Sequence, residues 1–182
     1  ANDFLSIVEN NGAWMLWRDL AAIAPNRLAI YREMAEILEQ EGKVKELVEI
    51  LTIIWKVSSD KDPISLKIAK NYLSLEQPDK ALFYLNRISK QGMSPETYRM
   101  KAGLERKLGL RNQEIISLEK AMELDPEDAK LHKEYLVLVG EAGLIEKQIA
   151  TFDSIQYNNY DQETLFDIVT THLHHLHSSE MI

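Results

Sequence analysis

The sequence contains no cysteine, which excludes disulfide bonds, thiolate zinc sites and cysteine nucleophiles. The same absence leaves the compartment open, because a cysteine-free chain suits cytoplasm and periplasm alike. Glycine and proline are scarce, at seven and five residues, which argues against a β-sandwich with many tight turns. No apolar run approaches the roughly 18 residues of a membrane span, and the first residues lack the pattern of a signal peptide.

Positive charge is also in short supply. Lysine and arginine number 21 against 29 aspartate and glutamate residues, a formal net charge of −8. Nucleic acid is therefore a poor default partner, because neutralising phosphates needs a cationic surplus. A hydrophobic content of 45% and a charged content of 27% are typical of a folded chain. Long runs of alanine, leucine, glutamate, lysine, arginine and glutamine favour helices.

An apolar pattern recurs along the chain with a period close to 34 residues. Each copy has the internal spacing 0, +4, +7, which places three side chains on one stripe of a helix. The step between the third and fourth copies is one residue shorter, and we place this shift in the loop around Lys90–Pro95. The copies are Ala13/Trp17/Leu20, Leu47/Leu51/Ile54, Ala81/Leu85/Ile88, Glu114/Leu118/Ala121 and Gln148/Phe152/Ile155.

Helix start and stop signals recur in step with these copies. Asp62-Pro63 and Ser94-Pro95 each offer an N-cap side chain followed by proline at the first helical position, and Asn26 and Asp161 are further N-cap candidates. Turns between paired helices are predicted at Gly42, Glu76-Gln77-Pro78, Gly109 and Gly143.

A second set of stripes predicts one more helix ahead of each copy. These stripes combine large residues with a small one where a neighbouring helix must approach closely. In the segment 97–108, Met100, Leu104 and Leu108 compete with Tyr98 and Ala102 for the inward face. The other stripes are Tyr31/Met34/Ala35/Leu38, Ile68/Ala69/Tyr72, Tyr135/Leu136/Val139 and Phe166/Val169/Leu173.

These residues resemble the tetratricopeptide repeat family, whose units are two antiparallel helices in about 34 residues. The resemblance covers roughly residues 1–175. It implies an all-α fold, a right-handed α-solenoid of antiparallel helix pairs. Matching small or apolar positions are Ala35, Ala69 and Ala102 in first helices, and Ala81, Leu85, Ile88, Leu118 and Ala121 in second helices, with a closing proline at Pro126. The sequence departs from the family pattern at five positions. A small residue is usual in the family where this chain has Glu114, Leu136 and Gln148, and an apolar residue is usual where it has Lys101 and Glu105.

The repeat phase predicts a single repeat domain over residues 1–182. It begins with a partial repeat at 1–25, continues with repeats at 26–61, 62–94, 95–128 and 129–161, and ends with a terminal helix at 162–182. Because the repeat units at both ends are incomplete, we expect this chain to be a segment of a longer array of repeats.

No motif for catalysis is present: the chain lacks a nucleophile elbow, a phosphate loop and an H-E-x-x-H sequence. We therefore expect no enzyme and no cofactor. Four histidines near the end have the (i, i+3) spacing that lets two imidazoles share a metal, but nothing nearby completes a ligand set. We interpret them as part of a polar terminal helix without a metal site, with adventitious metal binding as the alternative. They are His172, His174, His175 and His177.

The resemblance implies that the first helices line a concave groove that binds a partner. Groove positions carry eight basic and seven acidic residues, whereas the whole chain has a net charge of −8. A groove less negative than the rest of the chain favours a protein or an extended acidic peptide as partner. The predicted groove residues are Arg32, Leu66, Lys67, Lys70, Leu73, Tyr98, Arg99, Arg106, Lys107, Lys130 and Lys133.

Two other interpretations stay open. Charges on any solvated helix are mixed, so the groove pattern alone does not establish binding. A different function is self-association through end repeats, as a structural segment of a larger multi-protein complex of the envelope or polysaccharide-export type. A mass in solution that rises with concentration separates self-association from a monomeric groove binder.

Overall fold

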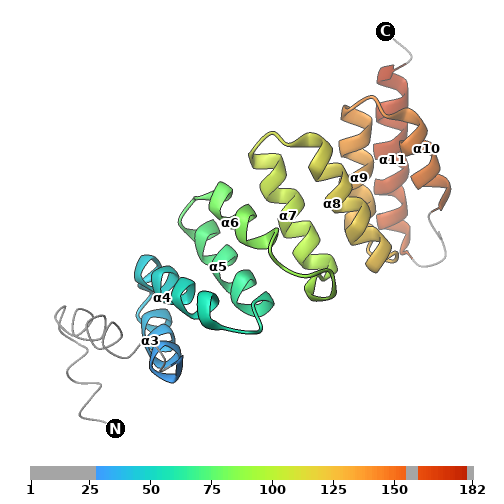
Figure 1. The fold of residues 1–182 in the computed structure, drawn as a ribbon. Coiled ribbons are helices and arrows are strands. Elements are labelled where there is room, and N and C mark those ends of the chain that lie inside the picture. The colour runs from blue at the N-terminus through green and yellow to red at the C-terminus, as the bar shows by residue number, and fades with distance from the viewer. Residues whose placement is uncertain (1–27, 155–159, 180–182) are drawn as a thin grey trace. The chain divides into compact units, whose positions relative to one another are not determined.

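The structure, a computed structural model, describes residues 28–154 and 160–179; within the last helix it describes the side chains of 162–170 and 173. This part of the chain is helical and contains no strand. The chain divides into two compact units, Ala1–Ser89 (unit 1) and Lys90–Ile182 (unit 2) (Figure 1). None of the described helices combines the length and the apolar character needed to cross a membrane.

Unit 1 is built from consecutive helices that pack on their neighbours in the chain. The helices that the structure describes in this unit are α3 (Leu28–Gln40), α4 (Val44–Val57), α5 (Asp62–Ser74) and α6 (Pro78–Leu85). Each helix packs on the next, and short turns make the partners of a pair antiparallel. The buried apolar residues of unit 1 are Tyr31, Met34, Ala35, Leu38, Leu47, Val48, Ile50, Leu51, Ile54, Ile68, Ala69, Ala81, Leu82, Tyr84 and Leu85.

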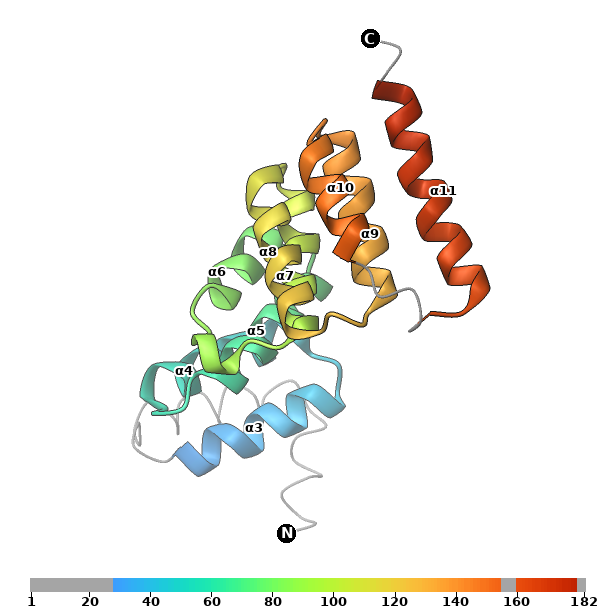
Figure 2. The same ribbon diagram turned by 90° about the vertical axis from the view of Figure 1, so that its right-hand side faces the viewer.

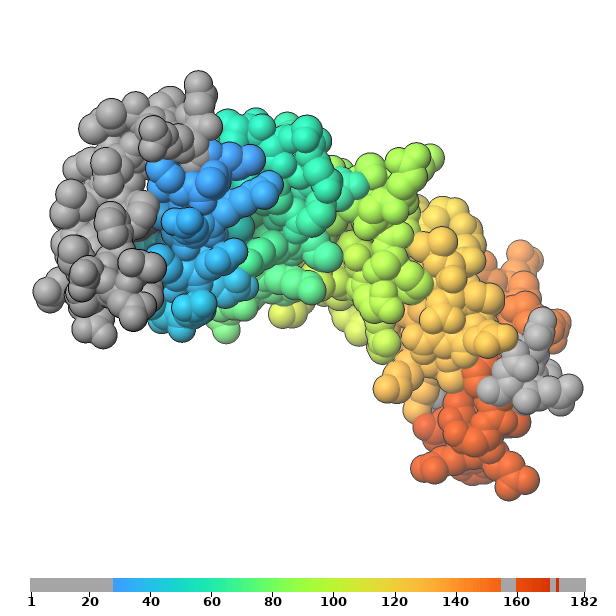
Figure 3. Space-filling model, turned by 90° about the horizontal axis from the view of Figure 1, so that it is seen from below, coloured from blue at the N-terminus to red at the C-terminus, as the bar shows by residue number. Residues whose placement is uncertain are grey.

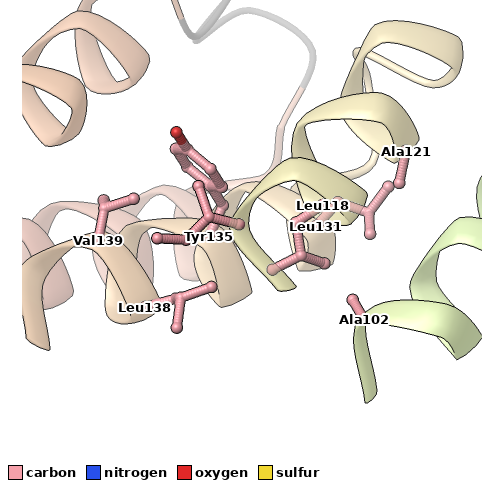
Figure 4. Packing of buried hydrophobic residues seen from close by; sticks show 8 residues of the cluster. Ala102, Leu118, Ala121, Leu131, Tyr135, Leu138 and Val139 are labelled. Atoms are coloured by element: carbon pink, nitrogen blue, oxygen red, sulfur yellow. The ribbon is translucent and has the colours of Figure 1, made fainter. Parts of the chain in front are cut away.

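Unit 2 repeats this arrangement, with α7 paired to α8 and α9 to α10 (Figure 2). A short 3-10 helix, η1 (Lys90–Gly92), precedes α7 (Pro95–Lys107), α8 (Arg111–Leu124), α9 (Ala129–Glu141), α10 (Ile145–Ser154) and α11 (Gln162–Ser179). Helix α9 also packs on α8 and α11. The core of unit 2 contains Ala102, Ile115, Leu118, Ala121, Leu131, Tyr135, Leu138 and Val139 (Figure 4).

The all-α fold class predicted from the sequence is confirmed, and the helix starts reproduce the period. First helices α5 and α7 begin 33 residues apart, as do second helices α6 and α8. The corresponding steps from α3 to α5 and from α4 to α6 are 34 residues. The one-residue shift therefore lies between the start of α6 and the start of α7, in the region that contains the predicted loop.

The predicted stripes agree with burial in most helices. In α4 and α8 all three residues of the second-helix stripe are buried, whereas Ile88 lies beyond the end of α6 and is half-buried. In α7, Ala102 and Leu104 share the inward face. The first copy, Ala13/Trp17/Leu20, and Ile155 of the last copy lie outside the described residues.

The stripe predicted for α11 is wrong. Phe166 and Leu173 are 69% and 57% exposed, and the buried residue is instead Ile168, which packs with Leu136 of α9. The prediction extended to this helix the face of the first helices that precede it in the chain. Among the described elements α11 packs mainly on α9, so a single stripe suffices for its burial.

The predicted caps are partly confirmed. Ser94 accepts a hydrogen bond from the Thr97 amide at 3.2 Å, and Asp161 accepts one from the Thr164 amide at 2.7 Å. Asp62 differs, because α5 begins at Asp62 itself. Its carboxylate instead accepts from the amide and hydroxyl of Ser89, at 2.9 and 2.5 Å, and so links the start of α5 to the end of unit 1. Asn26 lies outside the described residues.

The turns between paired helices share one backbone conformation. Gly42, Gly109 and Gly143 have φ of 67°, 71° and 68°, and Glu76 occupies the same place in the α5–α6 turn with φ of 55°. The residue after each of them donates its amide to a carbonyl near the end of the first helix, as Gln77 does to Tyr72 at 2.9 Å. Glu76 thus holds a left-handed conformation that favours glycine.

Glycine at position 76 should stabilise unit 1. Left-handed backbone costs an L-residue about 1–2 kcal/mol, while glycine raises the entropy lost on folding by about 0.5–1 kcal/mol. We expect Glu76→Gly to raise the free energy of unfolding by roughly 0.5–1 kcal/mol, measured by urea denaturation.

Gly42→Ala is the matched control, because it makes the reverse kind of change at an equivalent left-handed position and its added Cβ meets no atom within 4 Å. That variant should lose stability by about 1 kcal/mol. A loss of stability in Glu76→Gly would contradict the assignment of strain to this turn.

Candidate functional site

Three of the eight predicted groove cations are paired with a carboxylate of a neighbouring first helix. In unit 1, Lys67 of α5 contacts Glu39 of α3 at 2.6 Å. In unit 2, Arg99 of α7 contacts Glu134 of α9 at 2.5 Å. Further along, Lys133 of α9 and Asp167 of α11 form a third pair at 2.5 Å. We call the face that carries these pairs the first-helix surface of each unit; it comprises α3 and α5 in unit 1, and α7, α9 and α11 in unit 2.

Arg99 is the most strongly held of these cations. Its guanidinium donates through Nε and a terminal nitrogen to the two oxygens of Glu134, a fork geometry that favours both charges. Asp128 lies 3.8 Å from the other terminal nitrogen. The hydrogen bond to Glu134 raises the pKa of the Arg99 guanidinium, against the effect of partial burial. Arg99 therefore fixes α7 to α9 as well as contributing to the surface.

The remaining predicted residues lie in different environments. Tyr98 is half-buried and packs against the core of unit 2. Leu66 and Leu73 are half-buried on α5. Arg106 is exposed but donates to Glu114 of α8. The other four, which are exposed and form no ion pair with another described residue, are Arg32, Lys70, Lys107 and Lys130.

Two pockets open on the first-helix surface of unit 2, where α9 and α11 lie next to each other in Figure 3. The α7–α9 pocket, of about 510 Å³, is lined by Arg99, Arg106, Lys130, Lys133, Glu134, Val137, Leu138 and Glu141. The α9–α11 pocket, of about 710 Å³, is lined by Glu96, Arg99, Glu127, Asp128, Ala129, Lys130, Lys133, Thr164, Asp167 and Ile168. The structure thus brings Arg99, Lys130 and Lys133 together.

The two pockets differ in charge. Four cations face two carboxylates in the α7–α9 pocket, whereas three cations face four carboxylates in the α9–α11 pocket. Val137 and Leu138 add an apolar wall to the first, and the sequence analysis missed both. Val137 follows Lys133 and Glu134 at helical spacing, so the periodicity of the groove positions contained the signal for it.

The departures from the family pattern in α7 and α8 each have a polar partner. Glu105 and Glu114 are 2% and 3% exposed. Ser117 donates its hydroxyl to Glu105 at 2.6 Å, and Lys101 lies 3.8 Å from the same carboxylate. Burial raises the pKa of Glu105, although the Ser117 hydrogen bond and the charge of Lys101 act in the opposite direction. This network places polar side chains where the family uses apolar ones.

Gln148 also departs from the family pattern, but no polar side chain pairs with it among the described residues. Its side chain is 1% exposed, and neither amide atom has a hydrogen-bond partner in the described part of the chain. An unsatisfied buried group of this kind costs about 1–3 kcal/mol. Helix α10 therefore carries a destabilising residue on its inward face.

Among the residues whose side chains the structure describes, no group of three histidines and carboxylates is arranged to hold a metal ion. The four histidines near the end, His172, His174, His175 and His177, have side chains outside that set. The expectation about them stays a prediction.

Neutralising Glu105 should stabilise the protein at neutral pH. Because its pKa is raised on folding, the folded state binds the proton more tightly than the unfolded state, and the free energy of unfolding falls as pH rises from about 4 through the folded pKa. Glu105→Gln removes this titration and keeps an acceptor for Ser117. We expect the variant to be more stable than wild type at pH 7, with the difference vanishing near pH 4, in urea unfolding measured across this range.

The control is Glu146→Gln on α10, an exposed carboxylate that lies outside the network. It should change the free energy of unfolding at pH 7 by less than about 0.5 kcal/mol, as surface substitutions usually do. A Glu105→Gln variant less stable than wild type at pH 7 would mean that the Lys101 interaction outweighs burial.

Comparisons with known proteins identify the fold. No family model matches the chain, and no curated protein does. Solved structures do match: a MamA structure (AMB-1) has a TM-score of 0.64 at 16% identity, covering 85% of this chain and 86% of its own. YrrB, described as a TPR protein with an unusual peptide-binding site, has a TM-score of 0.59 at 13% identity, covering 90% and 97%. MamA from Desulfovibrio magneticus RS-1 has a TM-score of 0.56 at 16% identity, covering 84% and 87%.

At these identities the likeness establishes the fold alone. It agrees with the helix pairs, the period and the left-handed turns found in both units. The chain therefore has the fold of the tetratricopeptide repeat family.

Proposed function

We propose that the chain is a non-catalytic scaffold that binds a segment of a partner protein on its first-helix surface. The fold supports this proposal, because stacked helix pairs present preformed surfaces and leave most of the ordering entropy to the partner. YrrB, whose fold is similar, is described as having a peptide-binding site. The non-catalytic part of the proposal rests on the lack of catalytic motifs in the sequence.

The observation that carries the proposal is the α7–α9 pocket. Its volume of about 510 Å³ accommodates one or two side chains of an extended peptide. Val137 and Leu138 offer an apolar wall, and Lys130 offers a charge without an ion-pair partner among the described residues. Apolar surface beside a free cation suits a segment that alternates apolar and acidic side chains.

The charged side chains that line the α7–α9 pocket determine which charge a bound segment should carry. Arg99 and Lys133 already interact with Glu134 and Asp167, so they contribute less to attraction than their number suggests. Lys130 supplies most of the remaining positive potential in the α7–α9 pocket. The preference for an acidic segment should therefore be moderate, and sensitive to salt.

In unit 1 the comparable residues are Lys70 and Arg32, both exposed, with Leu66 and Leu73 half-buried on α5. We include them in the proposed surface of that unit. Self-association, the second hypothesis from the sequence, stays a prediction. The dependence of solution mass on concentration tests it.

Reversing the charge at Lys130 should weaken binding. Peptides selected by the full-length chain from a random phage library are expected to be acidic and to contain an apolar residue. For such a peptide, Lys130→Glu should raise Kd by about tenfold, or about 1.4 kcal/mol, because it removes an attraction and introduces a repulsion. Fluorescence anisotropy at two salt concentrations measures both the affinity and its flatter salt dependence.

Lys45→Glu is the control, because Lys45 is exposed on second helix α4 and the change in net charge is the same. It should leave Kd nearly unchanged. Failure to select any acidic peptide, or equal affinity of wild type and Lys130→Glu for a selected acidic peptide, would refute the proposed surface.

A further inference from the structure

A third pocket of unit 2 lies on the side of the second helices. The α8–α10 pocket, of about 530 Å³, is formed by α8, the α8–α9 connection, α9 and α10. Of the residues that line the two first-helix pockets it shares only Glu127. In Figure 4 the Tyr135 ring lies in the core, while its hydroxyl points away from Leu131 and Leu138. This hydroxyl is one of the polar groups of the α8–α10 pocket.

Two hydrogen bonds in this pocket converge on one oxygen of Glu119. The Tyr135 hydroxyl and the Lys147 ammonium each donate to Oε1 at 2.7 Å. Burial acts to raise the pKa of Glu119, but these hydrogen bonds outweigh it and the pKa is lowered, so the carboxylate is charged at neutral pH. The second oxygen, Oε2, receives no hydrogen bond from a described residue. It is an acceptor without a donor.

A second group in the pocket also lacks a partner. The side chain of His132 is 5% exposed and lines the pocket. Its Nδ1 contacts the Tyr160 hydroxyl at 3.1 Å, and Nε2 has no partner among the described residues. Burial lowers the pKa of His132, against the charges of Asp128 and Asp125, so the ring is neutral at pH 7. In the tautomer whose Nδ1–H donates to the Tyr160 hydroxyl, the neutral imidazole presents Nε2 to a ligand as an acceptor.

The walls and rim narrow the class of ligand. Met122, Pro126 and Ala150 are apolar, whereas Glu123 and Glu127 add carboxylates at the rim. Glu123 also contacts Lys120 at 2.6 Å, which moderates its charge. Among lining residues, three carboxylates face the single cation Lys147. An anionic ligand is repelled, and an apolar ligand would leave the Glu119 carboxylate desolvated without a donor.

We propose that the α8–α10 pocket binds an arginine side chain of a partner protein. The methylene stem lies along Met122 and Pro126, and the guanidinium donates to Glu119 and His132. Arginine is favoured over lysine because its planar head presents five N–H donors, enough for two acceptors at once. This site shares helix α9 with the acidic-segment site but none of the residues that line the α7–α9 pocket, and it does not depend on that site. The scaffold would then recognise opposite charges on two faces.

The test is a titration of the full-length ¹⁵N-labelled chain with N-acetyl-arginine N-methylamide, followed by ¹H–¹⁵N correlation spectra. We expect saturable shifts at Met122, His132, Ala150 and Thr151, with Kd on the order of 1 mM, as suits a single side chain. The citrulline analogue has the same shape without the charge and should produce shifts at least fivefold smaller at equal concentration.

Glu119→Gln keeps an acceptor for Tyr135 and removes the charge, and it should weaken binding of the arginine probe at least fivefold. Glu146→Gln, on α10 but outside the pocket, is the matched control and should bind as wild type does. Three results would overturn the proposal. They are no shifts at these residues, equal shifts with the citrulline analogue, and unchanged affinity in Glu119→Gln when its spectrum shows a folded protein.

Discussion

Close approach of neighbouring helices is the constraint on which the rest of this structure depends. Ala69 in unit 1, and Ala102 and Ala121 in unit 2, are at most 1% exposed. Side chains of this size let adjacent helix backbones come near enough for larger residues, such as Leu118, to fill the space between them. Each helix thus buries its apolar stripe on its neighbours in the chain. The outward faces of the first helices are consequently available for recognition.

Polar side chains buried between these helices are of two kinds, those with polar partners and those without. In α7 and α8 the buried carboxylates Glu105 and Glu114 are matched by Ser117, Lys101 and Arg106. In α10 the buried amide of Gln148 has no partner. Arg106 belongs both to the network and to the α7–α9 pocket, so an acidic ligand near it competes with Glu114 for the same guanidinium. In the proposed complex, binding in this pocket would therefore be coupled to the stability of the α7–α8 pair.

Sequence patterns predicted the features that arise from neighbouring residues. The period, the buried stripes of α4 and α8, the cap at Ser94 and the left-handed turns all depend on a few residues in sequence. The left-handed φ of Glu76 shows that the turn geometry persists even where glycine is absent, because the flanking helix pair fixes it. The tetratricopeptide fold was therefore predictable from one chain.

Features that depend on contacts between helices were not predictable in this way. Lys67 and Lys70 look equivalent in sequence, yet only Lys67 meets a carboxylate, Glu39 of the preceding first helix. Which face of α11 is exposed depends on which other helices pack against it. The apolar pattern within the α11 sequence carries no information about those helices. The α8–α10 pocket is lined by residues of three helices, and two hydrogen bonds at Glu119 connect α8 to α9 and to α10.

The central claim is that a partner segment binds on the first helices of unit 2. Backbone amide shifts of the full-length chain, recorded as a selected acidic peptide is added, test it most directly. If the segment binds there, the largest changes in amide chemical shift are expected on α9, at Lys130, Lys133 and Val137, with smaller changes at Arg99 of α7. Changes confined to α8 and α10, with α9 unaffected, would contradict it.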